Sequence, residues 1–272
     1  MIFFYILLGA CVFLFLAYIL ATRCRKGHEG LSKLRSYAYA HRGLHGDGVP
    51  ENSLKAFALA VDAGYGSELD VHLLADGNLA VIHDSTLQRT TSSLGIVEDL
   101  KVQDLQNFWL EGTDQHIPTL NEVLAIYNGR FPLIVELKPV GNNHAELCTK
   151  VAEMLDAYEG SYCIESFDPR CVAWFRKNRP DVVRGQLTEN FFLSPSSKLP
   201  AIIKFVMKVQ LLNFLTLPDF IAYKFKDRVN FSNFLCRKIW GAQGVTWTLK
   251  SQAEFDIAVA EDWIPIFEGF RP

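Results

Sequence analysis

Two short segments place acids at a spacing that could hold a metal ion. Glu68-Leu69-Asp70 has a carboxylate at each end, and Glu136-Leu137-Lys138 has a carboxylate and an ammonium at the same spacing. In a β-strand, side chains two residues apart point to one face, and in a closed barrel that face is the interior. The three carboxylates are hard oxygen ligands, which suit Mg²⁺ or Ca²⁺ better than zinc. A salt-bridged core is the plainer alternative, but charged side chains are rarely kept buried without a task.

Two histidines, His41 and His83, each end an apolar run. Either one alone is more typical of a structural histidine than of a catalyst. Together they can supply one general base and one general acid, which cleavage of a phosphodiester or a glycosidic bond requires. Arg42 and Lys138 add positive charge that suits phosphate oxygens. Glycosidic cleavage needs two carboxylates that no metal engages, so this set of residues favours phosphoryl chemistry.

A glycine-rich loop follows His41 and ends in Pro50-Glu51-Asn52-Ser53. Its glycines allow the backbone to turn steeply away from the strand. We expect the loop to bring Glu51 to the site and Ser53 to cap the helix that follows.

These residues need a scaffold that brings strand ends together, and the chain from residue 37 onward predicts one. Short β-rich runs alternate with amphipathic stretches, which indicates βα units and a parallel sheet. Eight strands are the number that a closed (β/α)8 barrel requires. A doubly wound open sheet is less well supported, because no dinucleotide-binding loop is evident. The predicted strands are Tyr37–His41, Ser67–Val71, Leu133–Lys138, Tyr162–Phe167, Val182–Leu187, Asp219–Phe225, Val245–Leu249 and Pro265–Phe270, and the predicted helices are Ser53–Ala63, Thr119–Tyr127, Asn143–Tyr158, Pro169–Asn178, Phe231–Ile239 and Ser251–Glu261.

One apolar run, Leu79–Asp84, breaks the alternation because it follows the second strand too closely for a parallel crossover. The intervening Asp76-Gly77 is a strong hairpin signal. We therefore predict a small antiparallel ribbon that continues the second barrel strand. A turn centred on Asp76-Gly77 would pair Asp70 with His83 and return that histidine to the level of the acids.

The first 22 residues contain no charged side chain and predict a transmembrane helix. A helix of this length would span roughly 33 Å, against a hydrocarbon core of about 30 Å. A cleaved signal peptide fits less well, because no basic segment precedes the apolar run and the run is too long. Arg23, Arg25 and Lys26 follow at once, which places the rest of the chain on the cytoplasmic side. The predicted division is an anchor at 1–22, a linker at 23–36 and a barrel domain at 37–272.

Composition narrows the classes of function. The chain of 272 residues has a formal net charge of -3 and an isoelectric point near 6.2, so it offers no basic field for a nucleic acid. Its six cysteines show no paired metal-binding spacing and suit a reducing compartment. These features favour a single-pass membrane protein whose barrel lies in the cytoplasm, and they argue against nucleic acid as a partner.

The motifs, taken in order along the chain, resemble those of the glycerophosphodiester phosphodiesterases. The resemblance implies a TIM barrel that hydrolyses glycerophosphodiesters to sn-glycerol 3-phosphate and an alcohol. It runs from Tyr39 nearly to the C-terminus. The matching motifs are His41-Arg42-Gly43, Pro50-Glu51-Asn52-Ser53, Glu68-Leu69-Asp70-Val71, Asp76-Gly77, His83-Asp84, Glu136-Leu137-Lys138, Ser166-Phe167 and Trp247-Thr248.

The resemblance also implies roles for individual residues. The acids that would bind a divalent cation, Mg²⁺ or Ca²⁺, are Glu68, Asp70 and Glu136. The acid/base pair would be His41 and His83. The residues that would contact phosphate or substrate are Arg42, Glu51, Lys138, Phe167 and Trp247. The two aromatic side chains would be apolar walls for the glycerol or the leaving group, although ordinary barrel packing explains them equally well.

Three alternatives stay open at this point. The substrate could be a lipid, as for a lysophospholipase D-like or phosphoinositide phosphodiesterase, or the barrel could be an inactive, membrane-tethered module that binds phosphodiesters.

The long apolar connection Phe191–Phe220 is either an outer helix packed on the barrel or a segment that lies against the bilayer.

Overall fold

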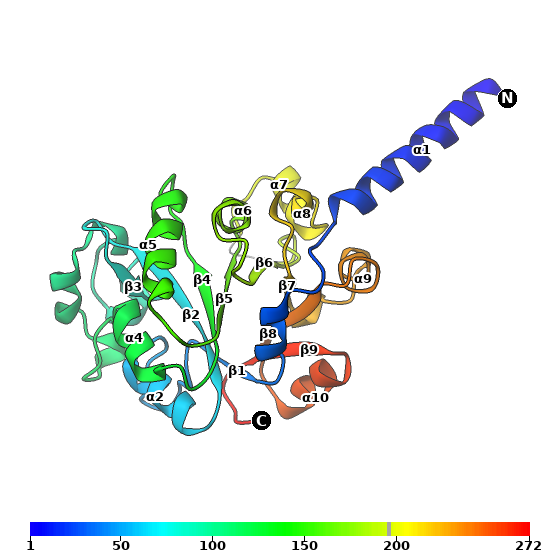
Figure 1. Cartoon of the computed structure of the whole chain (residues 1–272). Coiled ribbons are helices and arrows are strands. Elements are labelled where there is room, and N and C mark those ends of the chain that lie inside the picture. Colours follow the sequence, from blue (N-terminus) through cyan, green and yellow to red (C-terminus); the bar gives the residue numbers. More distant parts are fainter. Residues whose placement is uncertain (195–196) are drawn as a thin grey trace.

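Eight parallel strands form a closed barrel in the computed structural model, which describes residues 1–194 and 197–272 (Figure 1). Each strand pairs with its neighbour, and β1 pairs with both β2 and β9, which closes the sheet. The predicted (β/α)8 barrel is therefore confirmed. The barrel strands are β1 (Tyr39–His41), β2 (Gly66–Leu73), β4 (Leu133–Leu137), β5 (Tyr162–Ser166), β6 (Arg184–Thr188), β7 (Phe220–Lys224), β8 (Gln243–Leu249) and β9 (Trp263–Phe267).

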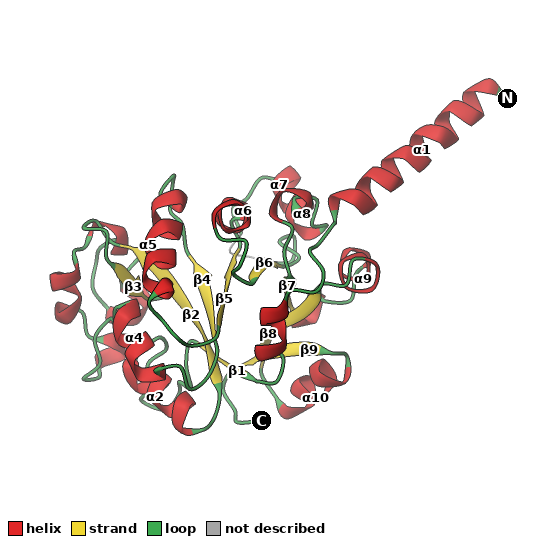
Figure 2. Cartoon of the chain, in the orientation of Figure 1, coloured by secondary structure: helices red, strands yellow, loops and turns green. Residues whose placement is uncertain are grey.

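Helices surround the strands on the outside of the barrel (Figure 2). Local capping signals set where several of them begin: Ser53 accepts a hydrogen bond from the Ala56 amide, and Thr119 and Glu122 form a reciprocal capping box. The helices are α2 (Leu54–Asp62), α3 (Gln88–Thr91), α4 (Leu120–Tyr127), α5 (His144–Asp156), α6 (Pro169–Asn178), α7 (Ala201–Lys208), α8 (Asn213–Thr216), α9 (Phe231–Phe234) and α10 (Gln252–Ala260). In the connection predicted at 191–220, Pro195 and Ser196 lie outside the described residues.

The ribbon after the second strand is present, but its register is not the predicted one. Strand β3 (Leu79–Val81) runs antiparallel to β2, and the Ile82 amide donates to the Asp70 carbonyl, so Ile82 and not His83 lies opposite Asp70. The reason is the turn: the Leu74 amide donates to the Asn78 carbonyl, which leaves a three-residue loop that ends at Gly77 with φ +81°. A three-residue loop shifts the pairing by one residue relative to a two-residue turn.

The amino end of the barrel is closed by the segment that precedes it. A short 3-10 helix, Glu29–Lys33, leads into Leu34, which is buried against the inward side chains of the strands. The Tyr39 hydroxyl donates to the Leu34 carbonyl at 2.9 Å. Arg25 forms an ion pair of 2.5 Å with the fully buried Asp219 and donates to the Pro180 carbonyl. The stretch predicted as a polar linker is thus fastened to the barrel.

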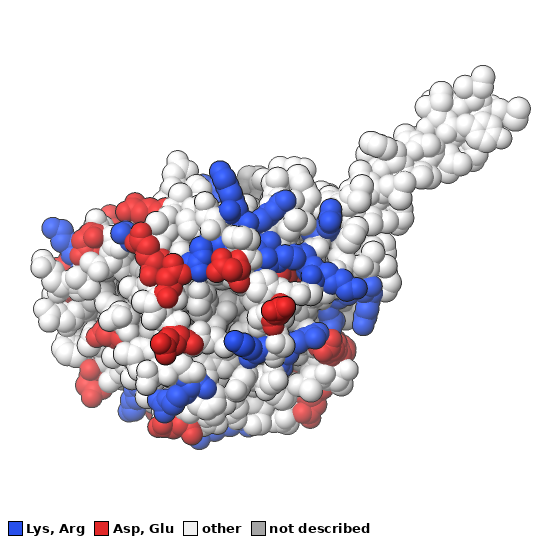
Figure 3. All heavy atoms as spheres, in the orientation of Figure 1, with Lys and Arg blue, Asp and Glu red and all other residues white. Residues whose placement is uncertain are grey.

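The first helix, α1 (Ile2–Ala21), projects away from the barrel, and none of its residues is buried (Figure 1). Among the described residues it is the one helix that is long and apolar enough to cross a membrane, and a signal sequence passes the same test. Figure 3 shows that it carries no charged side chain, whereas Lys and Arg side chains gather near its base.

Candidate active site

The three acids meet at the carboxyl end of the barrel. Strands β2 and β4 pair with Asp70 beside Glu136, and Glu68 lies two residues earlier on the same face as Asp70. All three side chains are buried, and each offers an oxygen within 4.8 Å of the others. The i, i+2 spacing and the strand register together produce this cluster.

The cluster has fewer donors than acceptors. One oxygen of Glu68 is buried without a hydrogen-bond donor, while one oxygen each of Asp70 and Glu136 faces the same ammonium, that of Lys138. The Lys138 ammonium lies 3.0 Å from Asp70 and 2.6 Å from Glu136, and the Asn52 amide donates to the other Asp70 oxygen at 2.8 Å. Three buried carboxylates that share Lys138 and Arg42, with one Glu68 oxygen unpaired, fit a hard divalent cation, which would supply the missing positive charge.

The pKa values of the three acids reflect the same shortage of positive charge. Burial, with the charges of the two neighbouring acids, raises the pKa of Glu68 well above its ordinary value. Burial also raises the pKa of Glu136, and Lys138 offsets only part of that effect. For Asp70 the effect of burial is outweighed by Lys138, His83 and Arg42, which hold the pKa well below its ordinary value. The site therefore does not hold three full negative charges without a further cation.

His41 ends β1 and is held by an acid from the other end of the chain. Its Nδ1 lies 2.6 Å from a carboxylate oxygen of Glu268, and its Nε2 lies 3.8 Å from Glu68. Burial lowers the pKa of His41 to about 4, although the hydrogen bond with Glu268 acts in the opposite direction. A depressed pKa keeps the imidazole neutral near pH 7, which is the form that accepts a proton.

His83 follows the paired residues of β3, so its side chain need not alternate in direction with those of the ribbon. It lines a small cavity beside the acids. Its Nδ1 is 2.5 Å from Asp84, which also forms an ion pair with Arg89. The backbone carbonyl of His83 is 3.1 Å from Nε2 of His72. The prediction that His83 comes back to the acids thus holds despite the wrong register.

Arg42 connects the acids to the loop that follows β1. It adopts a left-handed backbone (φ 56°), its amide donates to Glu68, and its guanidinium lies 3.3 Å from Asp70 and 2.9 Å from Glu51. Arg89 donates twice to the same Glu51 carboxylate. Glu51 is therefore held between two arginines, where it orients Arg42. A residue other than glycine in a left-handed conformation is strained, and such strain gathers at functional sites.

The acids and histidines face a cavity of about 40 Å³, which has room for only a few water-sized groups. One wall is apolar: the rings of Phe167 and Trp247 meet edge to face at 5.7 Å. Phe191 continues this wall, with its ring 5.9 Å from that of Phe167. The remainder of a larger substrate must lie outside this cavity, in the barrel mouth.

Three residues near the site were not predicted from the sequence. Asn52 binds Asp70, Glu268 binds His41, and Glu165 lines the cavity with its pKa raised well above the ordinary value by burial. The sequence contains a signal for each of them: Asn52 lies in the Pro50–Ser53 motif, and both acids lie in or directly after apolar strand-like runs.

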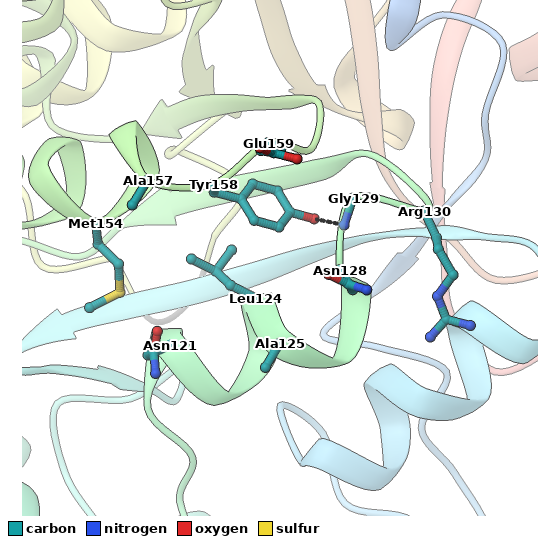
Figure 4. Close-up of a pocket in the computed structure, with 10 residues that line it drawn as sticks. All are labelled: Asn121, Leu124, Ala125, Asn128, Gly129, Arg130, Met154, Ala157, Tyr158 and Glu159. Carbon is teal, nitrogen blue, oxygen red and sulfur yellow. Dashed lines mark hydrogen bonds between the residues drawn. The ribbon is translucent and has the colours of Figure 1, made fainter.

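A larger hollow, of about 650 Å³, lies away from this chemistry (Figure 4). It is lined by α4, by the end of α5 and by the turns that lead into β4 and β5, where the Tyr158 hydroxyl accepts a hydrogen bond from the Gly129 amide. These turns are at the amino end of the barrel, which in TIM barrels serves stability and not catalysis. Size alone would therefore have pointed to the wrong site.

Comparisons with known proteins agree with this geometry. A sequence model of the glycerophosphoryl diester phosphodiesterase family matches residues 41–260. A glycerophosphodiester phosphodiesterase from Bacillus altitudinis is 35% identical over 175 residues, which is 60% of this chain and 71% of that protein. A lysophospholipase D from Rattus norvegicus is 34% identical over 160 residues, 54% of this chain and 48% of that protein.

Among solved structures, a phosphodiesterase from Oleispira antarctica in complex with its product, sn-glycerol-3-phosphate, superimposes with a TM-score of 0.72. It is 22% identical, and the match covers 88% of this chain and 94% of that one. At this identity the likeness concerns the fold, while the sequence relatives and the family match carry the assignment. The chain belongs to the glycerophosphoryl diester phosphodiesterase family and is an enzyme, a phosphoric diester hydrolase.

Proposed function

We propose that this enzyme hydrolyses glycerophosphodiesters to sn-glycerol 3-phosphate and an alcohol by histidine acid/base catalysis that depends on a divalent metal. The observation that carries the proposal is one small cavity that both histidines line together with Glu68 and Glu136, two acids of the cluster. Both histidines are held at Nδ1 by a carboxylate, which leaves Nε2 for proton transfer. The set of residues is therefore complete for chemistry on a phosphodiester.

The residues that would hold the cation are Glu68, Asp70 and Glu136, whose clustered carboxylate oxygens fit Mg²⁺ or Ca²⁺. When bound, the cation would neutralise charge that develops on the phosphate. Arg42 and Lys138 border the same cluster and would bind phosphate oxygens, while Glu51 keeps Arg42 in position. Phe167 and Trp247 would pack against the glycerol or the leaving group.

We assign the role of general base to His41, because its lowered pKa keeps it neutral. It would take a proton from the nucleophile, which is either water, giving the phosphate monoester directly, or the glycerol 2-hydroxyl, giving a cyclic phosphate that water opens in a second step. His83 would then donate a proton to the leaving alkoxide. Asp84 and Arg89 stabilise the position of that imidazole.

The test is turnover of glycerophosphocholine by the full chain in detergent, with Mg²⁺, with Ca²⁺ and with a chelator. We expect release of sn-glycerol 3-phosphate that depends on the cation and is lost in His41→Ala and in His83→Ala. Wild-type turnover in both variants would contradict the proposal. A folded wild-type chain that turns over no glycerophosphodiester would favour the inactive, phosphodiester-binding alternative.

A second candidate substrate is a lysophospholipid, and the apolar wall favours it. From Phe167 the wall continues through Phe191 to Phe192, which is half-exposed, with the Lys208 ammonium 5.8 Å from its ring. This strip could lie along an acyl chain. A panel of soluble glycerophosphodiesters against lysophosphatidylcholine, assayed with the wild type and with Phe192→Ser, separates the two. A loss confined to the lipid substrate supports the strip, and equal activities contradict it.

For the location we propose a single-pass membrane protein, with residues 1–22 as the anchor and the barrel domain, 37–272, in the cytoplasm. The support is the apolar helix and the basic residues that directly follow it. A cysteine introduced at Lys33, which is exposed, should resist a membrane-impermeant thiol reagent in intact cells until the membrane is opened. Rapid labelling in intact cells would reverse the orientation.

A further inference from the structure

Helices α7, α8 and α9 lie around the place where α1 leaves the barrel (Figure 1), and they expose large apolar side chains. Four of them, each roughly half exposed, lie on α8 and α9, and three more lie on α7. We call this set the collar; it consists of Phe214, Leu215, Phe231, Phe234, Ile202, Ile203 and Phe205. Exposed apolar side chains that gather on neighbouring helices mark a surface that can bind a protein or a membrane.

A buried polar seam joins the collar helices to the end of α1. The Gln210 amide donates to the Asn233 side chain at 2.5 Å, which connects the α7–α8 turn with α9. The Asn213 amide contacts the sulfurs of Cys236 and Cys24, and the latter follows α1 closely in the chain. These buried hydrogen bonds join α8 and α9 to the segment that directly follows α1.

The depth of the collar follows from its contacts with α1. The Phe231 ring is 6.3 Å from the ring of Phe15 and 6.2 Å from that of Tyr18, and the Tyr18 hydroxyl is hydrogen-bonded to Ser232. At 1.5 Å per residue, Phe15 is roughly 9 Å from the end of α1. If α1 crosses a bilayer, Phe231 therefore lies within roughly 9 Å of the point where α1 leaves the hydrocarbon core, on the acyl side of the headgroup boundary.

The surroundings of the collar have the chemistry of that boundary. The Trp240 indole donates to the carbonyl of Ile19 in the last turn of α1, and tryptophan is typical of membrane interfaces. Lys238, on the continuation of α9, is exposed. Beside Phe234, a hollow of about 320 Å³ is lined by Arg228, Arg237 and Lys238, of which Arg228 is paired with Glu261 in the same lining. Basic groups at this level attract anionic lipids.

We propose that the collar inserts into the headgroup–acyl boundary of an anionic bilayer and fixes the orientation of the barrel on it. This inference rests on the proposed membrane anchor, but not on the proposed hydrolytic reaction. The end of α7 is hydrogen-bonded to the carboxyl ends of two strands, through Thr188 to the Met207 carbonyl and Tyr223 to the Lys208 carbonyl. The collar therefore reaches the rim of the active-site mouth and places that rim beside the bilayer surface.

The test measures membrane depth at single positions of the full chain. All chains carry Cys11→Ser, which removes the exposed cysteine among the described residues. One cysteine is then introduced in place of Phe231, Phe13 or Ile257 and labelled with an environment-sensitive fluorophore. Ile257, on α10, is a matched control because it is similarly exposed. The chains are reconstituted in vesicles of phosphatidylcholine with a minority of phosphatidylglycerol, containing lipids with a quencher on the headgroup or deep in the acyl chain.

We expect the label at Phe231 to lose fluorescence with the headgroup quencher, the label at Phe13 with the deep quencher, and the label at Ile257 with neither. Quenching at Phe13 without quenching at Phe231 would leave the anchor in place and overturn the collar. Absence of quenching at both would overturn the anchor and the collar together. Phe214→Cys repeats the measurement should Phe231→Cys fail to fold. Turnover of glycerophosphocholine by the same chains tests the hydrolytic function separately.

Discussion

At the amino end of the barrel, the buried carboxylate of Asp219 is fully paired, because Arg25 and the Arg184 amide satisfy both of its oxygens. At the carboxyl end, three buried carboxylates share the Lys138 ammonium and the Arg42 side chain, and one oxygen of Glu68 has no donor. The amino end is also plugged by Leu34, whereas the carboxyl end holds a cavity. A buried charge without a full set of partners costs stability, and such a cost is kept where the group binds a ligand. The predictions below test this division between the two ends, from the largest effect to the smallest.

Asp70→Asn should abolish turnover, an effect beyond the roughly 10²–10⁴-fold expected from one acid/base group. The reason is that the variant loses a cation ligand and the partner of Lys138 and Arg42 at once. Cation affinity, measured by isothermal titration with Mg²⁺ and Ca²⁺, should fall with it. Thermal stability without metal should fall as well, because Lys138, His83 and Arg42 hold the pKa of Asp70 below its ordinary value and so favour its charged form in the fold. Wild-type cation affinity would refute the assignment of the metal site.

His41→Ala and His83→Ala should each lower the turnover number on the order of 10²–10⁴-fold, the usual range for a positioned acid or base. A base that must be neutral and an acid that must be protonated give a bell-shaped dependence of rate on pH. Each substitution should flatten one limb of the bell and leave cation affinity close to that of the wild type. An unchanged bell in either variant would contradict the role of that histidine.

Leu34→Ala should lower stability without lowering turnover, because it removes the side chain that closes the amino end of the barrel. Deleting a buried leucine side chain costs about 2–5 kcal/mol of unfolding free energy. We expect a lower denaturant midpoint and an unchanged turnover number under conditions where the chain is folded. Lys33→Ala, at an exposed neighbouring position, is the matched control and should change neither quantity. A loss of turnover in folded Leu34→Ala would mean that the two ends are coupled.

Glu268→Gln should produce the smallest effect, a loss of roughly 10–100-fold, as for other groups that orient a functional imidazole. Burial lowers the pKa of His41 to about 4, and the Glu268 carboxylate raises it. Removing that negative charge lowers the pKa of His41 further. The acid limb of the rate profile reports the pKa of the base, which must be neutral to act. This limb should therefore move to lower pH. Asp256→Asn, an exposed acid on α10, controls for loss of one charge. A limb that does not move in Glu268→Gln would show that Glu268 does not act on His41.

Much of the site could be predicted because its signals are local. Glu68 and Asp70 share a face since strand side chains alternate, and that holds in any strand that contains them. The strand–helix alternation similarly indicated eight strands before their pairing was known. The ribbon shows where such reasoning ends: Asp76-Gly77 marked the turn, but the hydrogen bond between Leu74 and Asn78 made the loop one residue longer than predicted.

The sequence by itself thus determined which residues could bind a cation and transfer protons, because residue type and spacing of two along a strand are properties of the chain. The tertiary structure decided which partner holds each of them. Glu268 reaches His41 only because β9 closes the barrel against β1, and Asn52 reaches Asp70 only through the fold of the loop. It also decided that Leu34 seals one end and that Phe231 packs against α1. Contacts between residues far apart in the chain depend on the closure and register of the whole sheet, which local patterns do not specify.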